Sequence, residues 1–366
     1  MPRLRPFLHA LLALTLVLAH QEPKTEREIQ VQKALQAAAY HCAPAVAEFT
    51  AARQRSWAQQ VLGGNPHLPA YDDLFAEGTY QERIAAKDST YLECSPVEET
   101  RIENNTCVLT PVVTEGPYYH TAGHPIRRNI AEYQIGLLTL LDIGVIDVNT
   151  CKPLPNVLVD IWHANATGHY AGHPFPKPEL VNEKPQVGGK RSGLLSAFPR
   201  TVYEESWLRG AWPTDRNGVA QFTTIFPGYY TGRATHVHTK VFTSWEPLPN
   251  GTFDAGNLAH VGQFFFEDNV NLQVDKACTF FLSPLPVLTS RNQMHPYTDN
   301  PIRHTYGRTR NWRDSLNIFE DSLGPEGQYY PVFKTHLLGG ILNQGVIAYI
   351  TMGINASASY DNWWKG

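Results

Sequence analysis

The 366-residue sequence predicts a mainly β protein, in which an antiparallel β-sandwich follows an N-terminal helical region. Short runs rich in β-branched and aromatic residues recur after Cys107, and clusters of Gly, Pro, Asn and Asp separate them, as expected of strands joined by turns. Before that point, apolar residues recur at helical spacing. With 42% hydrophobic and 17% charged residues, the chain has enough apolar material for a sizeable core.

Residues 1–19 have the pattern of a secretory signal peptide. Arg3 and Arg5 precede an apolar run over residues 7–19, which ends in small residues suited to cleavage. The run is too short to cross a bilayer of roughly 30 Å as a helix. We therefore expect a secreted, extracellular protein.

Residues 20–106 are expected to form a helical region followed by a linker. Pro44 lies inside the helical pattern, so a break near residues 41–42 should divide it into two shorter helices. The apolar positions that define the pattern are Leu35, Ala39, Cys42, Val46 and Phe49.

Residues 107–284 are expected to form the β-sandwich, and residues 285–366 a C-terminal extension that packs on it. The closely spaced strands favour an antiparallel arrangement over alternating β–α units. Within the extension, residues 289–327 are polar and predict a long loop, whereas residues 339–350 predict a strand that returns to the sandwich. The expected sandwich strands are 137–141, 157–162, 220–226, 236–242 and 263–266.

Secretion would place the five cysteines in an oxidising compartment, where disulfides persist. Two bridges and one free thiol are the simplest expectation, and the sequence leaves the pairing open. No CxxC pair is present to build a cysteine zinc site. Four N-glycosylation sequons, at Asn104, Asn165, Asn250 and Asn355, predict a glycoprotein, with Asn165 the least favoured because it lies within a dense motif.

The charge balance argues against two classes of partner. Lys and Arg number 30 and Asp and Glu number 34, for a net charge of -4. No basic field would attract nucleic acid or an anionic membrane, so we expect neither as a partner.

His236 and His238 are the first candidate metal ligands. On a strand, residues i and i+2 point to the same face, about 6 to 7 Å apart at the backbone, so their imidazoles can converge on one ion. With 15 histidines in the chain, such a pair also arises by chance, and imidazole alone does not choose among iron, copper and zinc.

Five blocks in fixed order make the pattern specific: TEGPYY, VDIWHANATGHY, RGAWPTD, IFPGYYTGRATHVH and HVGQFFF. Through them the sequence, from about Cys107 to Phe266, resembles the intradiol ring-cleavage dioxygenases, particularly their secreted fungal branch. The resemblance implies that the sandwich is the catalytic domain of an Fe(III)-dependent oxidoreductase. Such an enzyme uses O₂ to cleave a catechol-class aromatic between its two hydroxylated carbons, giving a muconate-type diacid.

The resemblance also implies the ligands of the ferric ion. In GPYY the ligand is the second tyrosine, Tyr119, which leaves Tyr118 as a wall residue. In PGYY it is Tyr230, and His236 and His238 complete the set. Phenolate oxygen suits Fe³⁺ because a hard cation prefers anionic oxygen to thiolate.

Three residues are assigned catalytic roles by the same resemblance. Tyr230 is the ligand that substrate displaces, Arg233 stabilises negative charge building on the substrate, and Gln263 lies near the substrate ring. Tyr170 and His163 fall in a matched block but are not counted as ligands, and His163 is expected to pack and hydrogen-bond.

Two other classes of protein stay open. A β-sandwich could keep the fold as a binding module without turnover, or the two histidines could hold copper or zinc with another donor. Which catechol is cleaved also stays open, because only two residues separate Tyr230 from Arg233, and Tyr229 stands where secreted relatives often have histidine. Some intracellular relatives dimerise through N-terminal helices, which leaves a homodimer open here.

Overall fold

The computed structural model describes residues 41–62, 113–172, 204–276 and 296–360, apart from short gaps within these ranges, and a few positions between 26 and 37. The signal peptide expected over residues 1–19 lies outside the described residues. So do Cys94, Cys107 and Cys278 and the sequon at Asn104. No helix in the described part of the chain is long and apolar enough to cross a membrane.

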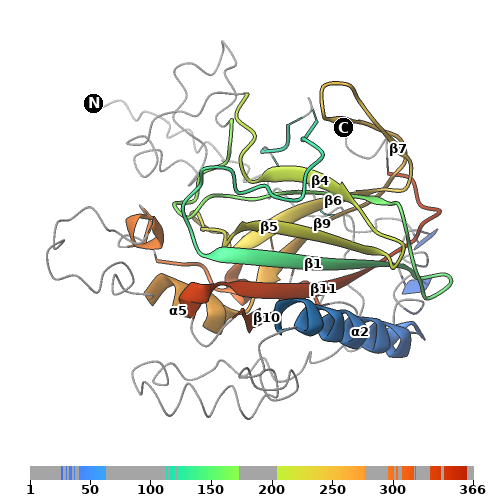
Figure 1. Cartoon of the computed structure of the whole chain (residues 1–366), viewed down its shortest axis with the longest axis horizontal. Coiled ribbons are helices and arrows are strands. Elements are labelled where there is room, and N and C mark those ends of the chain that lie inside the picture. Colours follow the sequence, from blue (N-terminus) through green and yellow to red (C-terminus); the bar gives the residue numbers. More distant parts are fainter. Residues whose placement is uncertain are drawn as a thin grey trace, which may run out of the picture.

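A curled, nine-stranded sheet forms the body of the molecule (Figure 1), in the order β2-β1-β11-β10-β9-β6-β3-β4 with β5 paired to β1. A separate hairpin consists of β7 (Trp245–Pro247) and β8 (Phe253–Ala255). The sheet strands are β1 (Leu138–Asp147), β2 (Lys152–Pro153), β3 (Leu158–Trp162), β4 (Arg209–Pro213), β5 (Val219–Ile225), β6 (His236–Phe242), β9 (Leu258–Phe266), β10 (Val332–Leu337) and β11 (Val346–Ile354).

The mainly β prediction is confirmed, but the sheet is mixed where an antiparallel sandwich was expected. β1 pairs with β11 in parallel, and so does β10 with β9, while the other strand pairs are antiparallel. The C-terminal region contributes β10 and β11 to this sheet, and β11 lies between β1 and β10.

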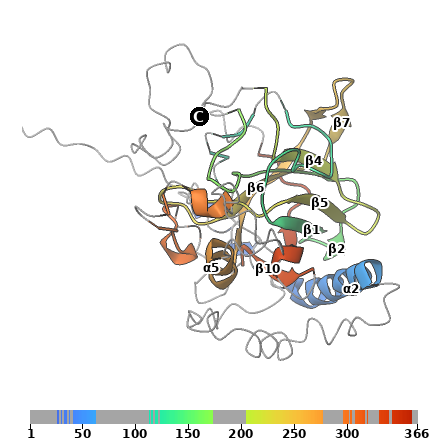
Figure 2. The ribbon, with the colours of Figure 1, turned by 60° about the vertical axis from the view of Figure 1, so that its left-hand side comes forward.

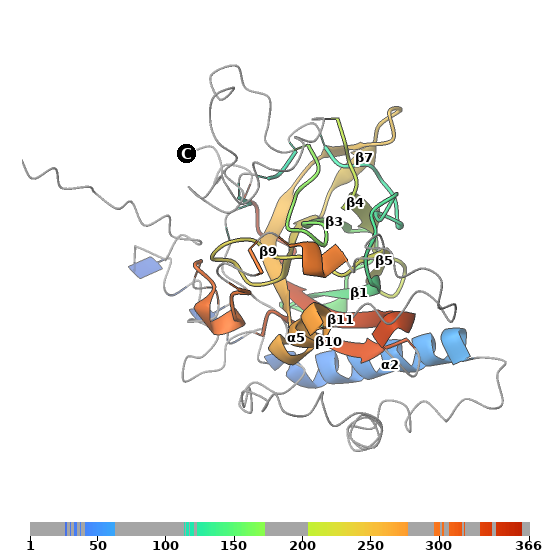
Figure 3. The ribbon, with the colours of Figure 1, turned by 90° about the vertical axis from the view of Figure 1, so that its left-hand side faces the viewer.

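The largest hydrophobic cluster of the described residues lies between the two halves of the curled sheet. Alternate residues of β3, β6 and β9, such as Ile161, Val237 and Phe264, share a buried cluster with Ile143 of β1 and Ile350 of β11. Figure 3 shows β9 running across the direction of β1 and β11, as the curl requires. Because side chains alternate along a strand, the intervening residues of β3, β6 and β9 point to the opposite face.

Helix α2 (Ala43–Leu62) lies along the β1–β11 half of the sheet (Figures 1 and 2). It begins just after Cys42, where the break was expected, with Pro44 in its first turn. Cys42 forms a disulfide with Cys151. Arg53 donates to the buried carboxylate of Asp142 at 2.6 Å, so a covalent bond and an ion pair both hold the helix on the sheet.

Shorter helices lie in the C-terminal half. Helix α5 (Asp268–Lys276) follows β9, and an ion pair of 2.8 Å joins Asp268 to Arg308. This pair fixes the segment that carries Asp314. The 3-10 helices are η4 (Pro296–Asp299), η5 (Asn311–Arg313) and η7 (Leu342–Gln344).

Candidate metal centre

His236 and His238 lie side by side on the face of β6 that points away from the core. Both are buried, and their Nε2 atoms are 3.1 Å apart. In the sheet register, His238 lies opposite Trp162 of β3 and Gln263 of β9. One transverse row of the sheet therefore supplies three side chains of the site.

The hydrogen bonding of His236 leaves the lone pair of its Nε2 facing the side chains beside it. Its Nδ1 lies 2.6 Å from the carbonyl oxygen of Ala234. Because a carbonyl only accepts, Nδ1 carries the proton and Nε2 is free to bind a cation. Burial, followed by the charge of Arg233, lowers the pKa of His236 well below its ordinary value. Burial and then His236 do the same to the pKa of His238, so both imidazoles are neutral, as metal ligation requires.

Two loops bring tyrosine hydroxyl groups to these histidines. The hydroxyl of Tyr230 lies 3.4 Å from Nε2 of His236. The hydroxyl of Tyr170 lies 3.3 Å from Nε2 of His236 and 3.2 Å from that of His238. These four residues, the four-residue centre, come from the loop after β3, the turn before β6 and β6 itself.

Glycines allow the two loops to interlock. A Cβ on Gly228 would lie 2.4 Å from the carbonyl oxygens of both Asn165 and Ala166, and a Cβ on Gly168 would lie 2.4 Å from that of Tyr229. Gly228 N also donates to Asn165 O at 3.0 Å. The ATGHY and PGYY motifs thus pack backbone against backbone, which brings Tyr170 and Tyr230 together.

Tyr119, the ligand expected from GPYY, does not join the four-residue centre. Its hydroxyl donates to Oδ2 of Asp160 at 3.1 Å, and its ring packs on Trp162. Tyr170, which was not counted as a ligand, occupies the place expected of Tyr119. The expectation for Tyr119 is therefore corrected, because the loop after β3 delivers a tyrosine to the histidines and the GPYY turn delivers one to Asp160.

Tyr118 forms a wall of the centre, as expected. Its ring stacks on that of Tyr170, with centroids 4.3 Å apart and planes 11° apart, and lies edge-on to Tyr230 at 5.7 Å. Burial, followed by the charge of Tyr230, raises the pKa of Tyr170 well above its ordinary value. Burial also raises the pKa of Tyr230, although Arg233 acts to lower it. Deprotonation of these phenols therefore needs a cation beside them.

Arg233 is the cation in contact with the centre. Its Nη1 donates to the hydroxyl of Tyr230 at 3.3 Å, and its Nη2 donates to Oε1 of Gln263. Both carboxylate oxygens of Asp314 accept from its Nε at 3.0 Å. Burial acts to lower the pKa of Arg233, but the charge of Asp314 and the nearby tyrosines outweigh it and raise the pKa overall. Arg233 thus keeps its charge while buried.

The donor set fits a hard trivalent cation. Donor atoms about 2 Å from one ion and roughly at right angles lie ~3 Å apart, close to the 3.1, 3.2, 3.3 and 3.4 Å separations seen here. In the described part of the chain, no group of three or more His, Cys, Asp or Glu side chains could hold a metal. Two phenols and two imidazoles are what the centre offers, and phenolate oxygen favours Fe³⁺.

Other residues of the motifs have structural roles. His163 bonds through Nδ1 to Ala164 O and through Nε2 to Thr224, both at 2.8 Å, which agrees with the packing role expected of it. Sequence reasoning missed Asp314 and Asp160, which support the site. A buried carboxylate within the strand VDIW was a usable signal for Asp160, whereas Asp314 stands in a polar segment with no pattern.

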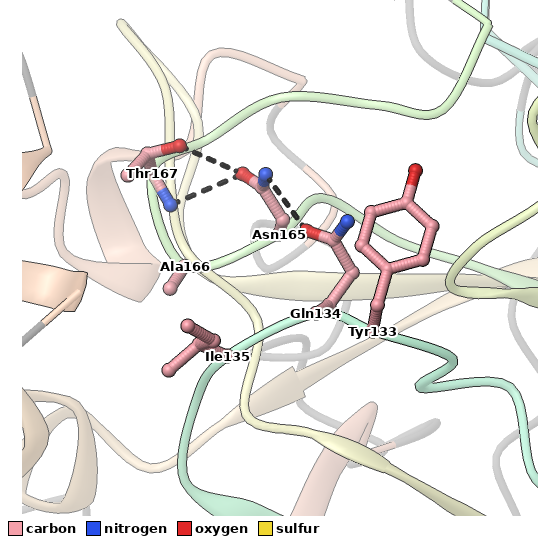
Figure 4. Close-up of a pocket in the computed structure, with 6 residues that line it drawn as sticks. All are labelled: Tyr133, Gln134, Ile135, Asn165, Ala166 and Thr167. Carbon is pink, nitrogen blue, oxygen red and sulfur yellow. Dashed lines mark hydrogen bonds between the residues drawn. The ribbon is translucent and has the colours of Figure 1, made fainter.

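A separate pocket with a cavity volume of about 250 Å³ opens on the loop that delivers Tyr170 (Figure 4). Asn165 is one of the residues that line it and bonds to Thr167 and Gln134. None of the four-residue centre lines it, and it is smaller than most ligand sites, which occupy about 300–1,000 Å³. We therefore do not assign the chemistry to this pocket.

The fold is similar to several solved structures. The intradiol ring-cleavage dioxygenase from Tetranychus urticae aligns at 25% identity and a TM-score of 0.47, over 70% of this chain and 98% of that one. Catechol 1,2-dioxygenase from Pseudomonas arvilla C-1 aligns at 16% identity and 0.34, over 67% and 62%. Hydroxyquinol 1,2-dioxygenase from Pseudomonas putida DLL-E4 aligns at 15% and 0.34, over 88% and 99%.

No protein-family model matches the chain, and no curated protein does. All three of these solved structures are dioxygenases by name.

Proposed function

We propose that this chain is an Fe(III)-dependent intradiol dioxygenase, which uses O₂ to cleave a catechol-class aromatic between its two hydroxylated carbons and yields a muconate-type diacid. The observation that carries the proposal is the four-residue centre, where two phenolic oxygens and two imidazole Nε2 atoms lie 3.1 to 3.4 Å from their neighbours. The sequence motifs that contain these residues support it.

The metal would be held by Tyr170, Tyr230, His236 and His238. A bound ferric ion would be chelated by the two oxygens of the catechol and would supply the electron-withdrawing chemistry that makes a ring carbon reactive toward O₂. Both atoms of O₂ enter the product, so the overall reaction needs no external reductant.

Arg233 would stabilise negative charge that develops at the site. Its guanidinium is buried and is fixed by Asp314 and Gln263, and it already donates to the oxygen of Tyr230. If substrate displaces Tyr230, the same Nη1 can hold the released oxygen while the guanidinium stabilises negative charge on the substrate. A preorganised cation of this kind costs no reorganisation when the reaction occurs.

Secretion belongs to the same proposal. The basic and apolar pattern of residues 1–19 supports it, and so does the Cys42–Cys151 disulfide, because disulfides persist mainly in oxidising compartments. The substrate would then be an extracellular phenolic compound. Asn250, whose side chain bonds only within its own exposed turn among the described residues, is the sequon best placed for a glycan.

Iron loading and colour test the proposal directly. Protein with one equivalent of Fe(III) should be reddish, because tyrosinate-to-iron charge transfer absorbs visible light, and should consume O₂ with catechol, hydroxyquinol or protocatechuate. Colourless protein with one equivalent of iron would refute the ligand assignment. Copper or zinc in place of iron, by elemental analysis, would instead support the alternative metal enzyme.

A matched pair of variants tests which tyrosine binds. Tyr170→Phe and Tyr119→Phe each remove one hydroxyl and keep the ring. We expect the first to lose much of the visible absorbance and nearly all oxygen uptake, and the second to keep a tyrosinate-to-iron charge-transfer band. Reversal of these two results would restore Tyr119 as the ligand.

A further inference from the structure

A buried carboxylate beside the four-residue centre organises a second cluster of polar side chains. Asp160, in the middle of β3, is fully buried. Its Oδ1 lies 2.5 Å from Nδ1 of His124, and its Oδ2 accepts from the hydroxyl of Tyr119 at 3.1 Å. A buried carboxylate without partners would be very costly at this depth, so these contacts stabilise Asp160 in the folded protein.

The tautomer of His124 is fixed from both sides. Nη1 of Arg209 lies 3.4 Å from its Nε2, and an arginine keeps all its protons. Nε2 of His124 therefore accepts from Arg209, and its Nδ1 donates to Asp160. The Asp160 cluster consists of four residues connected by hydrogen bonds with defined directions: Tyr119, His124, Asp160 and Arg209.

Arg209 connects this cluster to the ligand Tyr170. Its Nη2 donates to the carbonyl oxygen of Ala171 at 2.8 Å. Ala171 directly follows Tyr170, so this bond fixes the backbone next to the phenol whose oxygen meets both histidines.

Tyr119 connects the cluster to His238. Its ring packs edge-on against Trp162, with centroids 4.9 Å apart, and Trp162 stacks on the imidazole of His238 at 4.8 Å and 7°. Lys240 Nζ lies 3.5 Å from the centroid of the Tyr119 ring and pairs with Glu115 at 2.5 Å. The ring of Tyr119 is therefore held by Asp160, Lys240 and Trp162 together.

We propose that the Asp160 cluster positions Tyr170 and His238 for metal binding. Its four members are positioning residues, because their described contacts lead to Tyr170 through Ala171 and to His238 through Trp162. This inference rests on the proposed function in naming a metal, but the ordering of the two ligands does not depend on which metal binds. It also gives Tyr119 a role other than ligation.

Asp160→Asn is the main test, and Asp142→Asn is its matched control. Both carboxylates are fully buried and accept side-chain hydrogen bonds, but the donors to Asp142 are Arg53 and Trp57 of α2 and Gln221 of β5. Arg209→Lys is the second test variant, because lysine keeps the charge but lacks the planar fork that bonds two acceptors at once. A general loss of stability would affect all three variants.

Hydrogen exchange of metal-free protein measures positioning without reference to the metal. In the segment 163–172, which carries Tyr170, we expect exchange at least about tenfold faster in Asp160→Asn and Arg209→Lys, and unchanged in Asp142→Asn. Fe(III) titration then measures the consequence. Loss of an outer partner of a metal ligand typically lowers metal affinity about 10- to 100-fold, and the charge-transfer band should shift in the two test variants alone.

The outcomes separate this inference from the proposed function. Equal exchange in the segment 163–172 for Asp160→Asn and Asp142→Asn overturns the positioning role, whatever the metal does. Unchanged iron affinity and absorbance in both test variants overturns it too. Faster exchange, with a wild-type protein that shows no tyrosinate band when iron binds, supports the positioning of Tyr170 and refutes the iron site instead.

Discussion

Arg233 is held by three buried side chains, so its replacement alone would disturb its partners as well as remove its charge. Asp314, Gln263 and Tyr230 all bond to it. Removal of the guanidinium alone would leave the carboxylate of Asp314 buried and unpaired, which would destabilise the fold. The informative variant therefore removes both charges together.

Arg233→Met combined with Asp314→Asn should lower kcat about 10²- to 10³-fold, the usual effect of losing one preorganised electrostatic contact. Iron content should stay the same, because neither residue belongs to the four-residue centre. Arg128→Met, which removes an exposed arginine, is the control. Steady-state oxygen uptake measures kcat of the double variant and of the control. Equal kcat values in the two would refute the role of Arg233.

Asp275 makes stability depend on pH. Burial raises the pKa of this carboxyl from 3.8 to about 6, although Arg308 and Arg303 act to lower it. Because the folded pKa lies above the unfolded one, this carboxyl contributes its full stability below about pH 4 and loses it as pH rises through about 6. Asp275→Asn should therefore be more stable than wild type at pH 8, by up to about 3 kcal/mol. Urea unfolding from pH 4 to 8 checks this, and a constant difference would contradict it.

The choice between Tyr119 and Tyr170 shows the limit of sequence reasoning at this scale. The structure brings Tyr230, His236 and His238 together, with Arg233 and Gln263 in contact, as the motifs suggested. Both tyrosine motifs precede the histidines, however, and residue spacing does not show which loop reaches them. The interlocking of two loops through close backbone contact decides it, and no local pattern encodes that contact.

At the scale of elements, the contact between the ATGHY and PGYY loops is a point of weakness. A methyl group on Gly228 would meet two carbonyl oxygens at 2.4 Å, so the loops would have to separate. Gly228→Ala should therefore lower iron affinity at least about tenfold, as expected when a ligand's support is lost. Gly251→Ala, in a turn with nothing within 4 Å, should cost stability but keep the colour. Equal iron affinity in Gly228→Ala and wild type would contradict this account.

The disulfide should stabilise the docking of α2 without affecting the metal centre. Cys42 and Cys151 are separated by 109 residues, and closing a loop of that length stabilises a protein by about 4–5 kcal/mol in the chain-entropy model. Cys42→Ser with Cys151→Ser should lose that much in denaturant unfolding and keep the absorbance of the iron-loaded protein. Stability equal to that of wild type, or loss of the iron absorbance below the melting temperature, would be inconsistent with this role.

Strand positions could be predicted from the sequence, but strand partners could not. The expected strands at 157–162 and 236–242 nearly coincide with β3 and β6, because β-branched and aromatic runs between turn residues mark strands. The parallel pairing of β1 with β11 joins segments about 200 residues apart. Alternation within a strand carries no information about such a partner.

For the whole molecule, the curl of the sheet separates the roles of its two halves. One half carries α2 and the disulfide, the other carries the four-residue centre, and the largest hydrophobic cluster of the described residues lies between them. This arrangement follows from pairings distant in sequence, so the sequence predicted a mainly β fold without its mixed topology.

X-ray diffraction at the iron absorption edge tests the central claim most directly, because anomalous scattering locates iron without reference to the protein chain. Crystals of iron-loaded protein should show one strong peak bonded to the phenolic oxygens of Tyr170 and Tyr230 and to Nε2 of His236 and His238. A peak elsewhere, or one bonded to Tyr119 in place of Tyr170, would contradict the account.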